Sequence, residues 1–186
     1  RTVKKKIKPT RFLGPQPISM SKECLVPDNP HSVLSGYVVT EKADGIRAQL
    51  IIHSGISMLW SRGDESVGNS FPEIIEASKL IPYDICLDGE IMSWGGDGLG
   101  LFSELQQRLG RKNPGLSILQ RIPVRFMAYD ILAIEGQDLR EEPLSFRRKK
   151  LEAVLELLPS KFPVGLSSLV DEKDWFTLSQ LREESR

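Results

Sequence analysis

The sequence has few of the residues that bind metals, form disulfides or anchor a chain in a membrane. Its 186 residues include two cysteines and two histidines, Cys24, Cys86, His31 and His53, none at metal-ligand spacing. The cysteines are typical of free thiols, so we expect an intracellular protein. No hydrophobic run approaches the length of a membrane span and no signal peptide opens the chain, so we expect no membrane partner.

Net charge also gives no indication of a partner, because it is zero. Basic residues nevertheless cluster locally, within residues 1–8, at Arg108, Arg111 and Lys112, and at 147–150. Each cluster fits either a solvated face or contacts with an anion, and charge alone leaves both open. The glycine-rich stretch 95–98 lacks the lysine and Ser/Thr of a Walker loop and is predicted to be a mobile loop.

The chain is long enough for one domain with a hydrophobic core. Residues 1–35 contain repeated prolines and little periodicity, which predicts an extended segment packed on a folded domain of residues 36–186. Strands are predicted over residues 36–41, 48–52, 56–60, 85–92, 123–132 and 162–170. Helices are predicted over residues 71–80, 102–111, 144–158 and 173–186, with Ser70 and Ser103 as possible N-caps. These elements indicate an α+β fold.

The most informative stretch is Lys42-Ala43-Asp44-Gly45-Ile46-Arg47, which lies between two predicted strands. An Asp-Gly pair between apolar runs predicts a tight turn, with Lys42 at the end of the first strand and Arg47 returning beside it. An amine held near a carboxylate and a fixed cation can attack a phosphoryl group if its pKa is lowered. The same residues also fit an exposed hairpin with a charged tip.

The pattern K-x-D-G-x-R resembles motif I of the covalent nucleotidyltransferases, which include ATP-dependent DNA ligases, RNA ligases and mRNA capping enzymes. The resemblance implies that Lys42 attacks the α-phosphate of ATP with the help of Mg²⁺. It also implies catalytic roles for Asp44, which orients the amine, and Arg47, which with Mg²⁺ lowers its pKa. Thr40, Glu41, Lys42 and Arg47 are then expected to contact the nucleotide.

Three further stretches follow in the order that this superfamily shows. Asp88-Gly89-Glu90 resembles motif III, which makes Glu90 a ribose contact and the candidate metal ligand. Phe126 to Leu132 resembles motif IIIa, in which Tyr129 would stack on the purine. Ser61-Arg62 followed by Phe71-Pro72-Glu73 resembles motif Ia, in which Arg62 grips a DNA phosphate and, in our prediction, also contacts the nucleotide.

The segment between motifs III and IIIa indicates the branch of the superfamily. Residues 102–112, F-S-E-L-Q-Q-R-L-G-R-K, resemble an element of DNA ligases, which implies that Arg108, Arg111 and Lys112 contact DNA. Residues 12–19 instead resemble mRNA capping enzymes. The chain is therefore identified as resembling a DNA ligase, with a GTP-dependent capping enzyme, an RNA ligase, a non-catalytic nucleic-acid-binding fragment or a purely structural domain as alternatives.

The resemblance implies a nucleotidyltransferase fold with two packed, mainly antiparallel sheets flanked by helices. It also implies that AMP passes from the lysine to the 5′-phosphate of nicked double-stranded DNA, in repair, replication or recombination. Motifs IV and V are absent from the sequence, so we expect an adenylation domain that is incomplete at its C-terminus. An OB-fold domain, and possibly a DNA-binding domain, of the same full-length chain are the expected partners.

Overall fold

The computed structural model describes residues 44–95, 98–159, 161–169, 176–177 and 180. The helices and strands between residues 44 and 167 form one compact unit, and the described residues after Ser167 belong to a second unit. In these ranges no helix has the length and apolar character needed to cross a bilayer.

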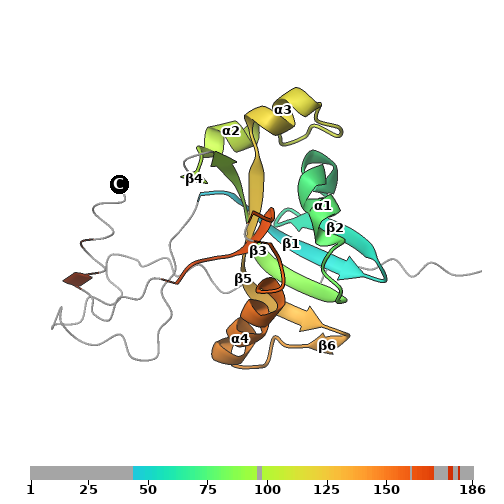
Figure 1. Ribbon diagram of the computed structural model, residues 1–186, viewed down its shortest axis with the longest axis vertical. Coiled ribbons are helices and arrows are strands. Elements are labelled where there is room, and N and C mark those ends of the chain that lie inside the picture. The colour runs from blue at the N-terminus through green and yellow to red at the C-terminus, as the bar shows by residue number, and fades with distance from the viewer. Residues whose placement is uncertain (1–43, 96–97, 160, 170–175, 178–179, 181–186) are drawn as a thin grey trace, which may run out of the picture. The chain divides into compact units, whose positions relative to one another are not determined.

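A single seven-stranded sheet forms the centre of the first unit (Figure 1). Its long strands are β1 (Ile46–His53), β2 (Ile56–Ser61), β3 (Ile85–Gly95) and β5 (Val124–Ile134). The short strands are β4 (Gly98–Leu99), β6 (Gln137–Asp138) and β7 (Val164–Leu166). The order is β2-β1-β3-β5-β6, with β4 paired to β3 and β7 to β5. All pairs are antiparallel except β5 with β7.

This arrangement confirms the α+β class and corrects the number of sheets. Two packed sheets were expected, but the strands in the described ranges form one, because β3 pairs with β1 on one side and with β5 on the other. The predicted strand over 36–41 lies outside the described residues. The predicted strand over 162–170 is only three residues long, and it joins the same sheet beside β5.

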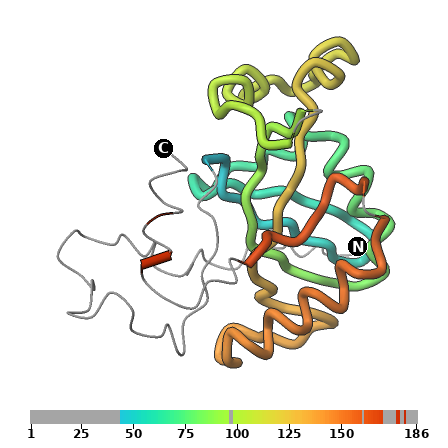
Figure 2. The backbone as a smooth tube through the Cα atoms, turned by 60° about the vertical axis from the view of Figure 1, so that its left-hand side comes forward, coloured from blue at the N-terminus to red at the C-terminus, as the bar shows by residue number. Residues whose placement is uncertain are grey.

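Helices lie along the sheet and at one end of it. They are α1 (Pro72–Ser78), α2 (Phe102–Gln106), α3 (Leu116–Arg121) and α4 (Leu144–Leu155), with a 3-10 turn η1 (Gly68–Ser70) before α1. Figures 1 and 2 show α2 and α3 together at one end of β3 and β5, with α4 toward the other end. The connection that carries the predicted basic cluster is therefore placed away from α4.

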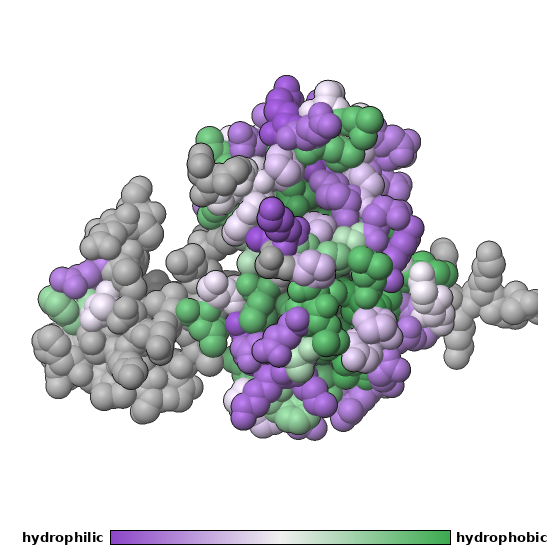
Figure 3. Space-filling model, in the orientation of Figure 1, coloured by the Kyte–Doolittle hydropathy of each residue, from purple (hydrophilic) through white to green (hydrophobic). Residues whose placement is uncertain are grey.

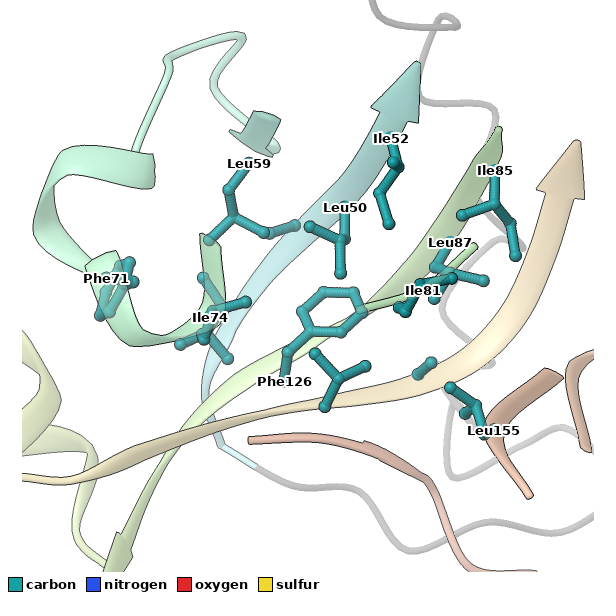
Figure 4. Close-up of a cluster of buried hydrophobic side chains, with 14 of the residues drawn as sticks. Leu50, Ile52, Leu59, Phe71, Ile74, Ile81, Ile85, Leu87, Phe126 and Leu155 are labelled. Atoms are coloured by element: carbon teal, nitrogen blue, oxygen red, sulfur yellow. The ribbon is translucent and has the colours of Figure 1, made fainter. Parts of the chain in front are cut away.

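The core lies between one face of the sheet and the helices α1 and α4. Leu50, Leu59 and Phe126 project from the strands toward Ile74 of α1, while Leu155 of α4 closes the other side (Figure 4). Each of the first four is fully buried. On the surface, Figure 3 shows hydrophobic side chains gathered in the middle of the face in view, with hydrophilic ones above and below.

Several predicted boundaries differ from the structure. The helix predicted over 102–111 ends at Gln106, because the following turns tighten to i→i−3 hydrogen bonds before Gly110 adopts a φ of 76°. At the two ends of the glycine-rich stretch, Gly95 of β3 pairs with Gly98 of β4, and residues 96–97 lie outside the described residues. Neither Ser70 nor Ser103 is an N-cap, since Phe71 and Leu101 hold those positions. Helix α3 was not predicted.

Candidate functional site

Four polar side chains gather on the sheet face opposite the main core. On β1, Ala48 and Leu50 point into the core, so Arg47, one position earlier, projects from the other face. In the register of β1 and β3, Arg47 lies opposite Glu90. Two positions before Glu90, Asp88 projects from the same face and meets Tyr129 of β5. Three adjacent strands thus bring together residues that are about 40 to 80 positions apart in the sequence.

Asp88 is the centre of this group. It is fully buried, and its carboxylate accepts hydrogen bonds from Arg47 Nη2 at 2.6 Å and Nε at 3.3 Å. The Tyr129 hydroxyl donates to the same carboxylate at 3.4 Å. Burial raises the pKa of Asp88, and the hydrogen bonds from Arg47 oppose that rise. The ion pair in turn raises the pKa of Arg47, which stays a cation.

Glu90 is the titratable group of the site. Burial raises its pKa to about 7, the nearby carboxylates of Asp88 and Asp44 add to this rise, and Arg47 opposes it. A carboxyl with this pKa is about half protonated at neutral pH. It can therefore accept a hydrogen bond from a hydroxyl as a carboxylate, or donate one as an acid.

Tyr129 presents a half-buried ring whose hydroxyl is anchored at Asp88. Burial raises the pKa of Tyr129 above its ordinary value, and the carboxylate of Asp88 acts in the same direction. The phenol therefore stays neutral, and its hydrogen bond orients the ring. An oriented aromatic face can stack against a planar base.

Two glycines let the strands carry these groups at close approach. A Cβ at Gly45 would lie 2.4 Å from the Ile91 carbonyl oxygen and 2.6 Å from Glu90 Cγ. A Cβ at Gly89 would lie 2.6 Å from the Met127 carbonyl oxygen. The glycines of K-A-D-G and D-G-E are thus required by packing, because any side chain there would force the strands apart.

Only some of the residues predicted to contact the nucleotide lie in the part of the chain that the structure describes. Arg47, Glu90 and Tyr129 converge as stated, and Asp44 lies exposed just before β1. Thr40, Glu41 and Lys42 lie outside the described residues. Within the described ranges, no three His, Cys, Asp or Glu side chains gather as a potential metal site. A metal role of Glu90 stays a prediction.

The predicted DNA-contacting residues fall into two groups. Arg62, Arg111 and Lys112 are exposed. The Arg62 backbone amide donates to the Arg47 carbonyl oxygen at 3.2 Å, so the backbone of Arg62 lies at the edge of the polar site. Arg108 differs from the prediction of an exposed cluster: it is fully buried and ion-paired with Glu73. The reason is the early end of α2, which turns this side chain toward α1.

Three residues bond the predicted site residues in the structure, and the sequence did not predict these contacts. They are Asp88, which bonds Arg47 and Tyr129, Ser70, which bonds Arg111, and Glu73, which bonds Arg108. From the sequence, Asp88 was named only as part of Asp88-Gly89-Glu90 and given no role of its own, although a carboxylate in an apolar run requires a partner. That signal was sufficient to predict a buried pair. Nothing in the sequence indicates the partner of Ser70 or Glu73, since both contact residues 35 or more positions away.

Comparison with known proteins adds a family match. A model described as an ATP dependent DNA ligase domain matches residues 31–184. A probable DNA ligase of Koribacter versatilis is 39% identical over 117 residues, which are 63% of this chain and 20% of that protein. A probable DNA ligase of Opitutus terrae is 42% identical over 129 residues, 67% of this chain and 13% of that protein. The chain thus spans about a fifth or less of these relatives.

Solved structures agree on the fold. The ligase domain of M. tuberculosis LigD superimposes with a TM-score of 0.65 at 22% identity, covering 83% of this chain and 47% of that domain. A mycobacterial DNA ligase D complexed with ATP and MES gives the same TM-score and identity, covering 84% of this chain and 48% of its own.

Proposed function

The chain belongs to the family of ATP-dependent DNA ligases, and from this membership we propose that it carries the adenylation chemistry of a DNA ligase. In this proposal, Lys42 attacks the α-phosphate of ATP, pyrophosphate leaves, and AMP stays bonded to the lysine nitrogen. AMP then passes to the 5′-phosphate of a nick, and the 3′-hydroxyl attacks that phosphate, which forms the phosphodiester bond and releases AMP. The observation that carries the proposal is the convergence of Arg47, Glu90 and Tyr129 on one sheet face.

The side chains on that face fit the parts of a nucleotide. Tyr129 offers an oriented ring for the base, and Glu90 offers a carboxyl that can bond a ribose hydroxyl. Arg47 stays charged and is fixed by Asp88, so it can meet a hydroxyl or phosphate oxygen without reorganising. A mycobacterial DNA ligase D of the same fold was solved in complex with ATP, which supports a nucleotide site on this fold.

Magnesium enters the proposal only with the nucleotide. Mg²⁺ in such sites is bound by one or two carboxylates together with substrate phosphates. The described residues contain no ligand cluster of their own. Glu90 is the proposed protein ligand.

Nicked duplex DNA is the proposed substrate, and the exposed cations are its proposed contacts. Arg62 lies directly after β2, and its backbone amide bonds the Arg47 carbonyl oxygen, which would bring a bound 5′-phosphate next to the nucleotide. Arg111 and Lys112 lie exposed in the turn after α2. Further domains of the full-length protein, an OB-fold domain among them, would complete the grip on the duplex.

Covalent labelling tests the proposal. The full-length protein that carries this chain, incubated with ATP labelled at the α-phosphate, should form an adduct that survives SDS. Lys42→Ala and Lys42→Arg should both abolish it, because a guanidinium stays protonated and cannot act as the nucleophile. Lys79→Arg, at an exposed lysine of similar chemistry on the C-terminal side of α1, should label normally. Labelling by GTP in place of ATP would favour a capping enzyme, and no labelling by either would favour a binding module.

A further inference from the structure

The buried guanidinium of Arg108 connects the end of α2 to the start of α1. Its Nη2 donates to Glu73 Oε2 and to the Ser70 carbonyl oxygen, both at 2.8 Å. Its Nη1 donates to the other Glu73 oxygen and, at 2.9 Å, to the Ile122 carbonyl oxygen. The group also lies over the Phe71 ring, 5.2 Å from its centroid. Arg108 is thus held on several sides and contributes no charge to the surface.

Ser70 links this buried group to the exposed turn that follows it. The Ser70 carbonyl oxygen accepts from Arg108, and the Ser70 hydroxyl donates to the Arg111 carbonyl oxygen at 3.0 Å. The Arg111 amide donates back to the Arg108 carbonyl oxygen at 3.2 Å. These contacts close a ring of three residues, and Gly110, with a φ of 76°, makes the reversal that the ring requires.

The outer side of the same turn carries Arg111 and Lys112, both exposed. A cation on a flexible loop loses conformational freedom when it binds, and that loss weakens binding. A turn already fixed by buried hydrogen bonds avoids most of this loss. The ring around Ser70 therefore affects how strongly the two cations bind an anion, although it adds no charge itself.

We propose that Arg108, Glu73 and Ser70 are positioning residues that hold the turn of residues 109–112 so that Arg111 and Lys112 meet consecutive phosphates of the DNA duplex. This inference rests on the proposed function, because it takes nicked DNA as the anion. It assigns to Arg108 a role in DNA binding through its neighbours and without contact to the DNA. A role in folding alone is the competing explanation, and the two differ in what the loss of Ser70 should change.

The test uses the full-length protein and a nicked duplex with a 5′-phosphate, with binding measured at several salt concentrations. Ser70→Ala removes one buried hydroxyl and keeps every charge. Ser78→Ala is its matched control, because Ser78 is also buried but its hydroxyl bonds the Ile75 carbonyl oxygen of its own helix. Glu73→Gln has a similar control in Glu76→Gln, which removes only an exposed pair with Lys79.

We expect Ser70→Ala and Glu73→Gln to weaken DNA binding by about two- to tenfold, the equivalent of one hydrogen bond. The slope of log affinity against log salt should stay at its wild-type value, because the phosphate contacts are still made. Both controls should bind as the wild type does. Arg111→Ala should weaken binding and also reduce the slope by about one. In a variant lacking both Arg111 and Lys112, Ser70→Ala should cause no additional loss.

Two results would overturn the positioning role alone: equal binding by Ser70→Ala and Ser78→Ala, or a Ser70→Ala loss that persists without the two cations. Unchanged binding after removal of both cations would overturn the DNA-contacting surface together with the positioning role. Lysine adenylation, measured with labelled ATP on the same variants, tests the proposed function separately. It should stay at the wild-type level in all of them.

Discussion

The carboxyl of Glu90 should make the stability of this fold depend on pH in a defined direction. Its pKa rises from an ordinary 4.5 to about 7 in the folded chain, chiefly because of burial. Between pH 4.5 and pH 7, Glu90 is therefore mostly protonated in the folded chain and mostly ionised in the unfolded chain. Glu90→Gln keeps the shape and hydrogen-bonding atoms of the side chain and removes the ionisation, so it isolates this effect.

The sign and magnitude follow from the shift. A raised carboxyl pKa favours the protonated form, so ionisation of Glu90 destabilises the folded state. This destabilisation is absent well below pH 4.5, grows as the pH rises from 4.5 to 7, and is complete above pH 7. At about 1.4 kcal/mol per pKa unit, the full shift sets an upper bound of about 3 kcal/mol. Since Glu90 keeps contact with solvent, screening reduces this to about 1–2 kcal/mol.

Urea unfolding of wild type and Glu90→Gln at pH 5 and pH 8 measures this difference. Glu90→Gln should be more stable than wild type by about 1–2 kcal/mol at pH 8, and by less than half of that at pH 5. Glu76→Gln, which changes an exposed glutamate, should show no comparable dependence on pH. A gain from Glu90→Gln that is equal at both pH values would refute the reasoning, because it would have nothing to do with ionisation.

Three other substitutions test the packing and the site. Arg108→Leu should lower the free energy of unfolding by about 3–5 kcal/mol, because it leaves a carboxylate and two backbone carbonyls without their donor. Its control, Arg140→Leu at an exposed ion pair, should lower the free energy of unfolding by less than about 1 kcal/mol. Gly89→Ala should destabilise by about 1–3 kcal/mol through overpacking, while Gly95→Ala, with open space around it, should not. Tyr129→Phe should weaken ATP binding in calorimetry less than Tyr129→Ala does, because the ring remains; equal losses would mean that stacking is not its role.

Much of the sheet could be predicted from the sequence because its strands are locally determined. The runs that became β1, β2, β3 and β5 combine β-branched residues with turn signals, and the structure confirms each of them. The number of sheets could not be predicted in this way. Pairing depends on which strands lie side by side, and β3 lies between β1 and β5 through contacts about 40 residues apart.

The polar site was predictable as a set of residues but not as a geometry. The motifs indicated Arg47, Glu90 and Tyr129 separately, and the register of three strands then places them together. Asp88, which holds two of them, was given no role of its own, because alternation alone does not say which face of β3 is covered. The raised pKa of Glu90 is likewise a consequence of burial, which composition and spacing do not reveal.

The basic residues after α2 illustrate the same limit with a functional consequence. Spaced three apart, Arg108 and Arg111 would share one face of a continuous helix, which is why the sequence predicts one cluster. The helix ends at Gln106, and the chain then reverses at Gly110, so one arginine turns inward to Glu73 and the other outward. Identical side chains thus acquire opposite environments within one turn. A substitution at the buried arginine should act on stability first, and one at the exposed arginine on DNA binding, although the sequence alone gives them the same role.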